Sequence, residues 1–292
     1  MSACIAASRL IDLRPSIGQT LLCLPGDPVQ PDYSIVIPVW GERYSNLIGA
    51  AIRSVREQSP EAPILVVDNA GQDPLRGLDS AQVLRLDERV SVGRARNVGL
   101  ESVETEFVLV LDADDTLVPG ALERLAVPLR SDRDLVAVVG RVVEGDGRRH
   151  RLPRRFAPSL ARFPRLFAAV NAGWLLFPVQ GCAMYRVAVA RTCGGYGDTH
   201  EGDDYELAVA LAAAGRIGFI SDVVRRYHDP HAGLGVPPDN ASLLRRARAV
   251  RERLVRRRWG RAARPFVFAV QVAAIYAVRP VVRATRRVTG RG

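Results

Sequence analysis

Three carboxylates, Asp112, Asp114 and Asp115, follow directly after the apolar run 107–111 (FVLVL). A run with no polar alternation predicts a strand that is covered on both faces. Like charges at this spacing repel and raise one another's pKa unless a positive charge lies among them. The cluster therefore predicts a positively charged partner at the end of a buried strand. The alternative use is capping of a helix after Pro119, which would account for Asp115.

The elements around this cluster alternate between strands and helices. Further apolar runs predict strands at 34–39, 64–71 and 83–86, and helical spacing of apolar residues predicts helices at 45–60, 92–103, 119–129 and 205–215. This order predicts a mostly parallel sheet whose ligand site lies at the carboxyl ends of the strands. Asp68 and Asp112 both stand at such ends.

Composition sets the class of protein. With 292 residues, 48% of them hydrophobic, the chain suits one large domain with appendages or two small domains. The four cysteines form no C-x-x-C pair, and charged residues interrupt any apolar signal core in the first 15 residues. Both features predict a cytoplasmic protein.

The net charge of +10 is unevenly distributed along the chain. Residues 240–292 carry 15 arginines and one acid, so the chain before them is mildly acidic. The apolar run 266–278 within this tail is shorter than the roughly 20 residues that span a bilayer. The tail is predicted to be helical, and it is a candidate for peripheral contact with the inner face of an anionic membrane or for nucleic-acid binding. The acidic body and the few aromatic residues argue against nucleic acid.

Five segments, YSIVIPVWGE, VVDNA, VGRARNVGL, VLDADD and EGDDYELAVAL, together resemble family 2 glycosyltransferases in order and approximate spacing. The resemblance covers roughly residues 33–232 and implies the GT-A fold, an α/β fold with a single mostly parallel sheet flanked by helices. It divides the chain into an N-terminal extension (1–32), a GT-A domain (33–235, with a donor half at 33–118 and an acceptor half at 119–235) and an Arg-rich helical tail (236–292).

The resemblance also implies a donor site. A nucleotide sugar brings two phosphate charges, and Mg²⁺ or Mn²⁺ shares oxygen ligands between protein and phosphate. In this interpretation Asp112 faces the ribose and the metal, Asp114 ligates the metal, and either His231 or His228 approaches it. Arg96 would bind phosphate and Trp40 would stack on the base, although a core role for Trp40 stays open. The full set of implied donor contacts is Pro38, Val39, Trp40, Glu42, Asp68, Arg96, Asn97, Asp112 and Ala113.

A second acidic group, Asp203 and Asp204, precedes the helix predicted at 205–215. By resemblance Asp204 is the general base on the acceptor, and Asp203 replaces the usual Glu. Glu201 is the alternative base, and helix capping by Asp204 is compatible with either assignment.

These residues predict an inverting, metal-dependent transfer of a sugar from a nucleotide-sugar donor (UDP, GDP or dTDP) to an acceptor hydroxyl. The acceptor would be a glycan, a lipid-linked molecule or a small molecule. The alternative is a catalytically weak GT-A-like protein that binds an anionic membrane or nucleic acid through its tail. The sequence leaves the sugar, the base, the acceptor and the oligomeric state open.

Overall fold

A computed structural model describes residues 31–228, apart from short gaps at 41–43, 45–46, 72–74, 76–77, 79–80, 146, 149–152, 174 and 200–201, and five positions between 265 and 273. The predicted N-terminal extension, apart from residues 31 and 32, and nearly all of the predicted tail therefore lie outside the described residues. Glu42, Glu201 and His231 lie outside them as well. Within the described residues, no helix is both long enough and apolar enough to cross a lipid bilayer.

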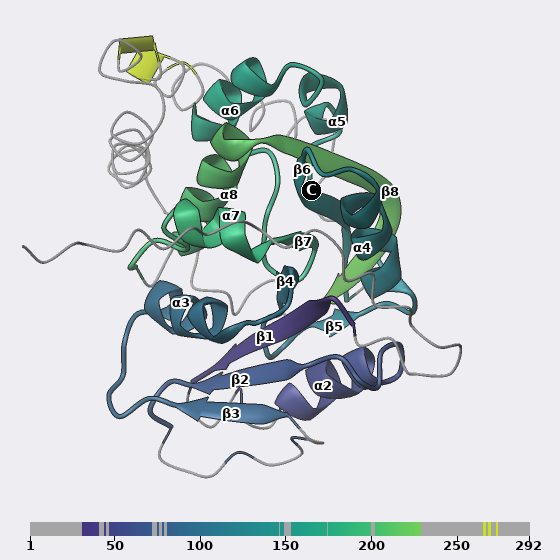
Figure 1. The fold of residues 1–292 in the computed structure, drawn as a ribbon, viewed down its shortest axis with the longest axis vertical. Coiled ribbons are helices and arrows are strands. Elements are labelled where there is room, and N and C mark those ends of the chain that lie inside the picture. The colour runs from purple at the N-terminus through teal and green to yellow at the C-terminus, as the bar shows by residue number, and fades with distance from the viewer. Residues whose placement is uncertain are drawn as a thin grey trace, which may run out of the picture. The chain divides into compact units, whose positions relative to one another are not determined.

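The donor half follows the predicted alternation of strands and helices (Figure 1). Its elements are β1 (Tyr33–Val39), α2 (Ile48–Arg56), β2 (Ile64–Asp68), β3 (Gln82–Arg85), α3 (Val92–Ser102) and β4 (Phe107–Val110). All residues of β1, β2 and β4 are buried. This burial explains why these three strands appear in the sequence as continuous apolar runs.

The acceptor half adds strands and helices on the other side of β4 (Figure 1). Its elements are α4 (Ala121–Ser131), β6 (Leu135–Glu144), α5 (Ala157–Leu160), α6 (Pro164–Gly173), β7 (Ala183–Arg186), α7 (Val187–Thr192), α8 (Asp203–Ala214) and β8 (Arg216–Tyr227). The short strand β5 (Thr116–Leu117), at the end of the predicted donor half, pairs with β8 at the far edge of the sheet. The predicted helices at 119–129 and 205–215 correspond to α4 and α8.

One eight-stranded sheet joins the two halves in the order β3-β2-β1-β4-β7-β6-β8-β5. Strands β1 to β4 pair in parallel, and so do β6 and β8, whereas β7 is antiparallel to both of its neighbours and β5 is antiparallel to β8. Six of the eight strands therefore run in one direction, and the predicted single, mostly parallel sheet is confirmed. After β3 the chain crosses back to form β4 on the other side of β1. Open α/β sheets bind ligands at such a switch point, which here lies between β1 and β4.

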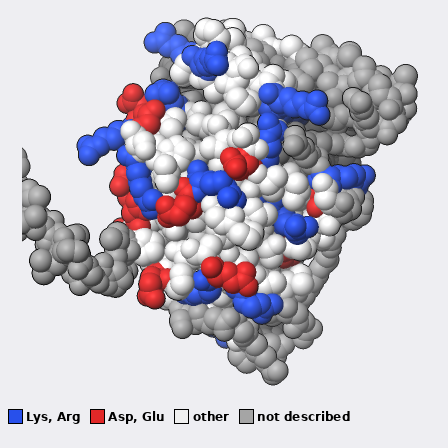
Figure 2. All heavy atoms as spheres, turned by 90° about the vertical axis from the view of Figure 1, so that its right-hand side faces the viewer, with Lys and Arg blue, Asp and Glu red and all other residues white. Residues whose placement is uncertain are grey.

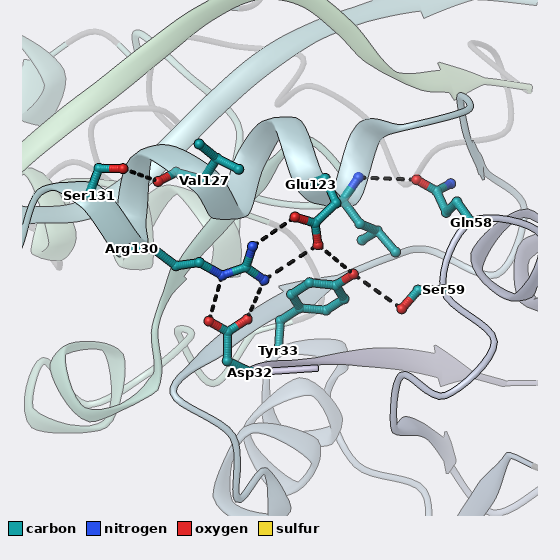
Figure 3. A network of polar contacts seen from close by, with 9 residues as sticks. Asp32, Tyr33, Gln58, Ser59, Glu123, Val127, Arg130 and Ser131 are labelled. Carbon is teal, nitrogen blue, oxygen red and sulfur yellow. Dashed lines mark hydrogen bonds and ion pairs between the residues drawn. The ribbon is translucent and has the colours of Figure 1, made fainter. Parts of the chain in front are cut away.

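A polar cluster closes the amino end of β1 (Figure 3). The Arg130 guanidinium on α4 donates to both Asp32 oxygens at 2.6 and 2.7 Å and to Glu123 Oε2 at 2.7 Å. The Tyr33 hydroxyl lies 3.2 Å from Glu123 Oε1 and 3.1 Å from Ser59 Oγ. We call Asp32, Tyr33, Glu123 and Arg130 the amino-edge cluster; it fastens α4 to the first strand, at the opposite end of β1 from Trp40.

Candidate active site

The predicted acidic residues meet at the carboxyl edge of the parallel strands. Asp68 is the last residue of β2, and Asp112 follows β4 by two positions. Because β2 and β4 both pair in parallel with β1, their carboxyl ends lie at the same edge. Asp203, the first residue of α8, comes from the acceptor half.

Arg96 joins the two acidic groups. Its Nη2 lies 2.6 Å from Asp112 Oδ1, and its Nη1 lies 2.5 Å from Asp203 Oδ2. The Arg96 side chain is only 9% exposed and that of Asp203 only 5%, so this is a buried ion-pair network. The positive charge that the clustered acids require is thus supplied, in part, by the protein itself. We call Arg96, Asp112, Asp203 and Asp204 the carboxyl-edge cluster.

A glycine allows this approach between α3 and the segment before α8. A Cβ built on Gly93 would lie 1.7 Å from the Gly197 carbonyl oxygen and 2.8 Å from Asp203 Cβ. The Gly93 amide donates to the Thr199 carbonyl at 3.2 Å. Any side chain at position 93 would push the segment away and lengthen the contact between Arg96, one helical turn later, and Asp203.

Asp204 lies beside this ion pair and is half-buried. Burial, followed by the neighbouring charge of Asp203, raises its pKa to about 6. With the Gln180 amide oriented to satisfy both neighbours, its nitrogen donates to Asp204 Oδ2 at 3.0 Å and its oxygen accepts from Arg96 at 3.2 Å. A carboxylate with a pKa near neutrality suits proton abstraction from a hydroxyl.

Asp115 pairs with an arginine of β8, whereas Asp112 pairs with Arg96. It is fully buried, and its Oδ2 lies 3.0 Å from Arg225 Nε on β8. Burial raises the pKa of Asp115 to about 7, although Arg225 opposes the shift. Gly181 makes room for Arg225, since a Cβ there would lie 2.4 Å from Arg225 Cδ. Asp115 therefore packs against Arg225 inside the protein and does not face a ligand.

Asp112 and Asp114 are both partly exposed, so a metal ion that arrives with a diphosphate could reach their carboxylates. The part of the chain that the structure describes holds no group of three or more His, Cys, Asp and Glu side chains arranged for a metal ion. Two carboxylates nevertheless fit Mg²⁺ or Mn²⁺ that is bound together with a diphosphate, because such ions usually take one or two protein carboxylates and complete their shell with phosphate and water. The His228 ring lies 2.9 Å from the Thr116 hydroxyl, whereas His231 is outside the described residues.

The predicted base-binding residues lie at the ends of β1 and β2. Trp40 is partly exposed and stacks with Tyr44 at 5.7 Å, while the Arg89 guanidinium lies 4.5 Å over its ring. Asp68 is 1% exposed, and its Oδ1 accepts from the Gly71 amide at 2.9 Å, so its carboxylate also holds the turn after β2. The side chains of Pro38, Val39 and Ala113 are buried, which leaves them to position Trp40, Asp112 and Asp114.

Asn97 holds the segment that leads toward Asp203. Its amide pairs with the Tyr196 backbone in both directions, at 3.0 and 2.8 Å. Gly195 has φ +65°, and a Cβ there would lie 2.2 Å from Asn97 Oδ1. The Tyr196 ring is buried beneath the Arg96 guanidinium at 5.6 Å. Arg96 and Asn97 thus act together, because both fix α3 to the acceptor half.

Sequence reasoning missed Gln180 and Arg225. Gln180 is 7% exposed and stands as a lone polar residue in the apolar run 175–185, a signal that could have identified it. Arg225 is one of two adjacent arginines on β8, and nothing in the local sequence separates the buried one from the exposed one.

Comparison with known proteins identifies proteins that are similar to this chain in sequence and in fold. Residues 34–194, more than half of the chain, match the family described as Glycosyl transferase family 2. The pre-mycofactocin glycosyltransferase of Mycobacterium tuberculosis is 26% identical over 212 residues, which cover 65% of this chain and 41% of that protein. The succinoglycan biosynthesis protein ExoO of Rhizobium meliloti is 28% identical over 144 residues, 47% of this chain and 40% of that protein. The chain thus spans about two fifths of the length of these curated relatives.

Among solved structures, the chain is similar to S. aureus TarS residues 1–349 in complex with UDP-GlcNAc. The TM-score is 0.63 at 16% sequence identity, over 84% of this chain and 72% of that one. At this identity the likeness shows a shared fold.

Proposed function

The chain belongs to glycosyl transferase family 2, and we propose that it transfers a sugar from a nucleotide-sugar donor to an acceptor hydroxyl, with inversion at the anomeric carbon. One observation carries the proposal. Arg96 ties the donor-side acid Asp112 to Asp203, and Asp203 is followed by Asp204, a carboxylate whose pKa is raised to about 6. The donor-side acid Asp112 and the proposed base Asp204 therefore belong to one cluster.

In this proposal Asp204 takes the proton of the acceptor hydroxyl as the oxygen attacks the anomeric carbon. The bond between that carbon and the donor phosphate breaks, and the nucleoside diphosphate leaves with the electron pair. Gln180 orients Asp204 through a hydrogen bond, and Arg96 holds Asp203 beside it. A single displacement of this kind inverts the anomeric carbon, since the attack is opposite to the leaving group.

Asp112 and Asp114 would hold Mn²⁺ or Mg²⁺ together with the donor phosphates, and the ion would supply charge neutralisation for the departing diphosphate. Trp40 and Asp68 would contact the base. UDP is the first nucleotide to test, because TarS was solved with UDP-GlcNAc. The names of the two curated relatives refer to different products, so they support sugar transfer rather than one acceptor.

Thermal unfolding with UDP, GDP and dTDP, each with and without Mn²⁺ or Mg²⁺, tests this proposal. A ligand present at 100 times its Kd stabilises the native state by about 2.7 kcal/mol. We expect one nucleotide to raise the Tm, and the metal to enlarge the shift. Asp114→Asn should remove the metal-dependent part, whereas Asp134→Asn, at an exposed acid after α4, should behave as wild type. A Tm that no nucleotide changes, with or without metal, would refute the donor site.

A further inference from the structure

The residues just before helices α5 and α6, together with the first turn of α6, expose apolar side chains next to arginines. Phe163 is 64% exposed, Leu166 is 47% exposed and Phe156 is 42% exposed. Every residue from Arg162 to Leu166 is exposed, and so is Arg155. We call this set, Arg155, Phe156, Arg162, Phe163, Arg165 and Leu166, the α5–α6 surface.

The charge around this surface has one sign. Between Asp146 and Asp198 the chain contains nine arginines and no Asp or Glu. Among the described residues, none of the ion pairs involves Arg155, Arg162 or Arg165. The uppermost described part of the face in Figure 2 is likewise blue and white without red, and Figure 1 has α5 and α6 at this end of the molecule.

The inner side of the same segment is firmly anchored. Phe167, directly after Leu166, is 1% exposed and stacks on Phe177 with ring centroids 5.9 Å apart. It also meets Phe219 of β8 edge-on at 5.9 Å. The core contact therefore fixes the orientation in which Phe163 and Leu166 face outward.

We propose that the α5–α6 surface docks on an anionic lipid bilayer. Phe and Leu side chains gain free energy when they enter the boundary between headgroups and acyl chains, and arginines beside them pair with anionic headgroups. The long arginine side chains can keep their charge at the headgroup level while their stems cover apolar surface. This inference goes beyond the transfer reaction and does not depend on it.

The other candidate occupants fit this surface less well. Residues 240–292 of the same chain carry 15 arginines and one acid, so they lack the charge that would complement it. A second copy bound by two-fold symmetry would bring the same arginines face to face. Nucleic acid would satisfy the arginines and could stack on phenylalanine, but it offers Leu166 no apolar environment.

The proposed docking surface is connected to the candidate base through one helix contact. Helix α6 packs against α8, which begins with Asp203 and Asp204. The Tyr205 hydroxyl donates to the Ala172 carbonyl near the end of α6, and the buried Ala172 and Val209 side chains pack together. Docking would therefore act on the acceptor half of the molecule.

Flotation of the full-length protein with vesicles tests the proposal. The vesicles contain phosphatidylcholine alone, or phosphatidylcholine and phosphatidylglycerol in equal parts. We expect binding to the anionic vesicles, weakened about tenfold or more by Arg162→Glu/Arg165→Glu. Phe163→Ser/Leu166→Ser should weaken it by a similar factor, without a change in the unfolding midpoint.

Matched controls test whether the loss of vesicle binding is specific to the α5–α6 surface. Arg53→Glu/Arg133→Glu makes the same charge change at exposed positions on α2 and after α4, and Val127→Ser replaces a 51% exposed apolar residue on α4. Both controls should float like wild type. Hydrogen exchange should also show that vesicles protect residues 155–166.

Three results would overturn the inference. The first is flotation of the surface variants to the same extent as wild type. The second is protection by vesicles of residues 240–292 alone, which would assign binding to the tail. The third is loss of binding to a single-stranded oligonucleotide in variants that keep vesicle binding, which would assign the surface to nucleic acid.

Discussion

Two arginines hold carboxylates at opposite ends of the same sheet, in very different surroundings. Arg130 in the amino-edge cluster is 37% exposed and contacts Asp32 and Glu123, whose side chains are 32% and 54% exposed (Figure 3). Arg96 in the carboxyl-edge cluster is 9% exposed and contacts Asp203, which is 5% exposed. The distances in the two clusters are nearly equal, between 2.5 and 2.7 Å for the shortest contacts.

Because the distances match, we expect burial to decide how much each ion pair contributes to the free energy of unfolding. Water screens the Arg130 contacts, so they add little stability despite good geometry. The Arg96 contacts replace water that the buried charges have lost, so removal of one partner leaves an uncompensated charge. Burial also raises the pKa of Asp204 to about 6, so the buried end of the sheet carries a proton acceptor near neutrality.

The largest expected effect is on turnover. Asp204→Asn keeps the size of the side chain but removes the proton acceptor, so kcat should fall by about 10²- to 10⁴-fold. Steady-state kinetics with the donor identified by thermal shift measures this fall. Glu123→Gln makes the same chemical change in the amino-edge cluster and should leave kcat unaltered. Turnover within a few-fold of wild type in Asp204→Asn would exclude Asp204 as the base.

The next effect is on stability. Arg96→Met leaves Asp203 buried without its cation, which is expected to lower the free energy of unfolding by about 3–5 kcal/mol. Urea unfolding followed by circular dichroism measures the change. Adding Asp203→Asn should recover part of the loss, because the uncompensated charge is then gone. If Arg96→Met lowers the free energy of unfolding no more than Arg130→Met does, burial does not explain a difference between the two clusters.

A further effect is on the pH dependence of kcat/KM. Only ionised Asp204 accepts a proton, so kcat/KM should fall about tenfold per pH unit below the pKa of about 6 and level off above it. Asp203 is the neighbouring charge that raises this pKa, so Asp203→Asn should move the midpoint to lower pH. Initial rates across the pH range measure the midpoint, with Glu123→Gln as the unshifted control. A midpoint that stays fixed in Asp203→Asn would remove Asp203 as a cause of the shift.

The sequence was sufficient to predict where the buried strands end, and therefore where much of the carboxyl-edge cluster lies. Buried strands appear as apolar runs, and parallel strands bring their carboxyl ends together, so the edge position of Asp68 and Asp112 followed from local signals. The placement of Asp203 and Asp204 beside them came from the family resemblance rather than from local pattern.

Pairings between distant segments could not be predicted in the same way. Arg96 was expected to bind phosphate, but its contact with Asp203 spans 107 positions and depends on how α3 and α8 pack. Arg225 reaches Asp115 because β8 is placed by sheet order, which no local pattern encodes. Tertiary packing therefore determined which charges became partners, whereas local sequence determined where the charges stood along each element.

The smallest expected effect belongs to the exposed arginine. Arg130→Met should lower the free energy of unfolding by only about 0.2–1 kcal/mol, because both carboxylates regain water when the guanidinium is removed. The difference should shrink further in high salt, since salt screens exposed charges. Urea unfolding of wild type and variant at low and high ionic strength measures both effects. A cost above 2 kcal/mol that salt does not reduce would mean that the amino-edge cluster behaves as a buried network, and the contrast between the two ends of the sheet would fail.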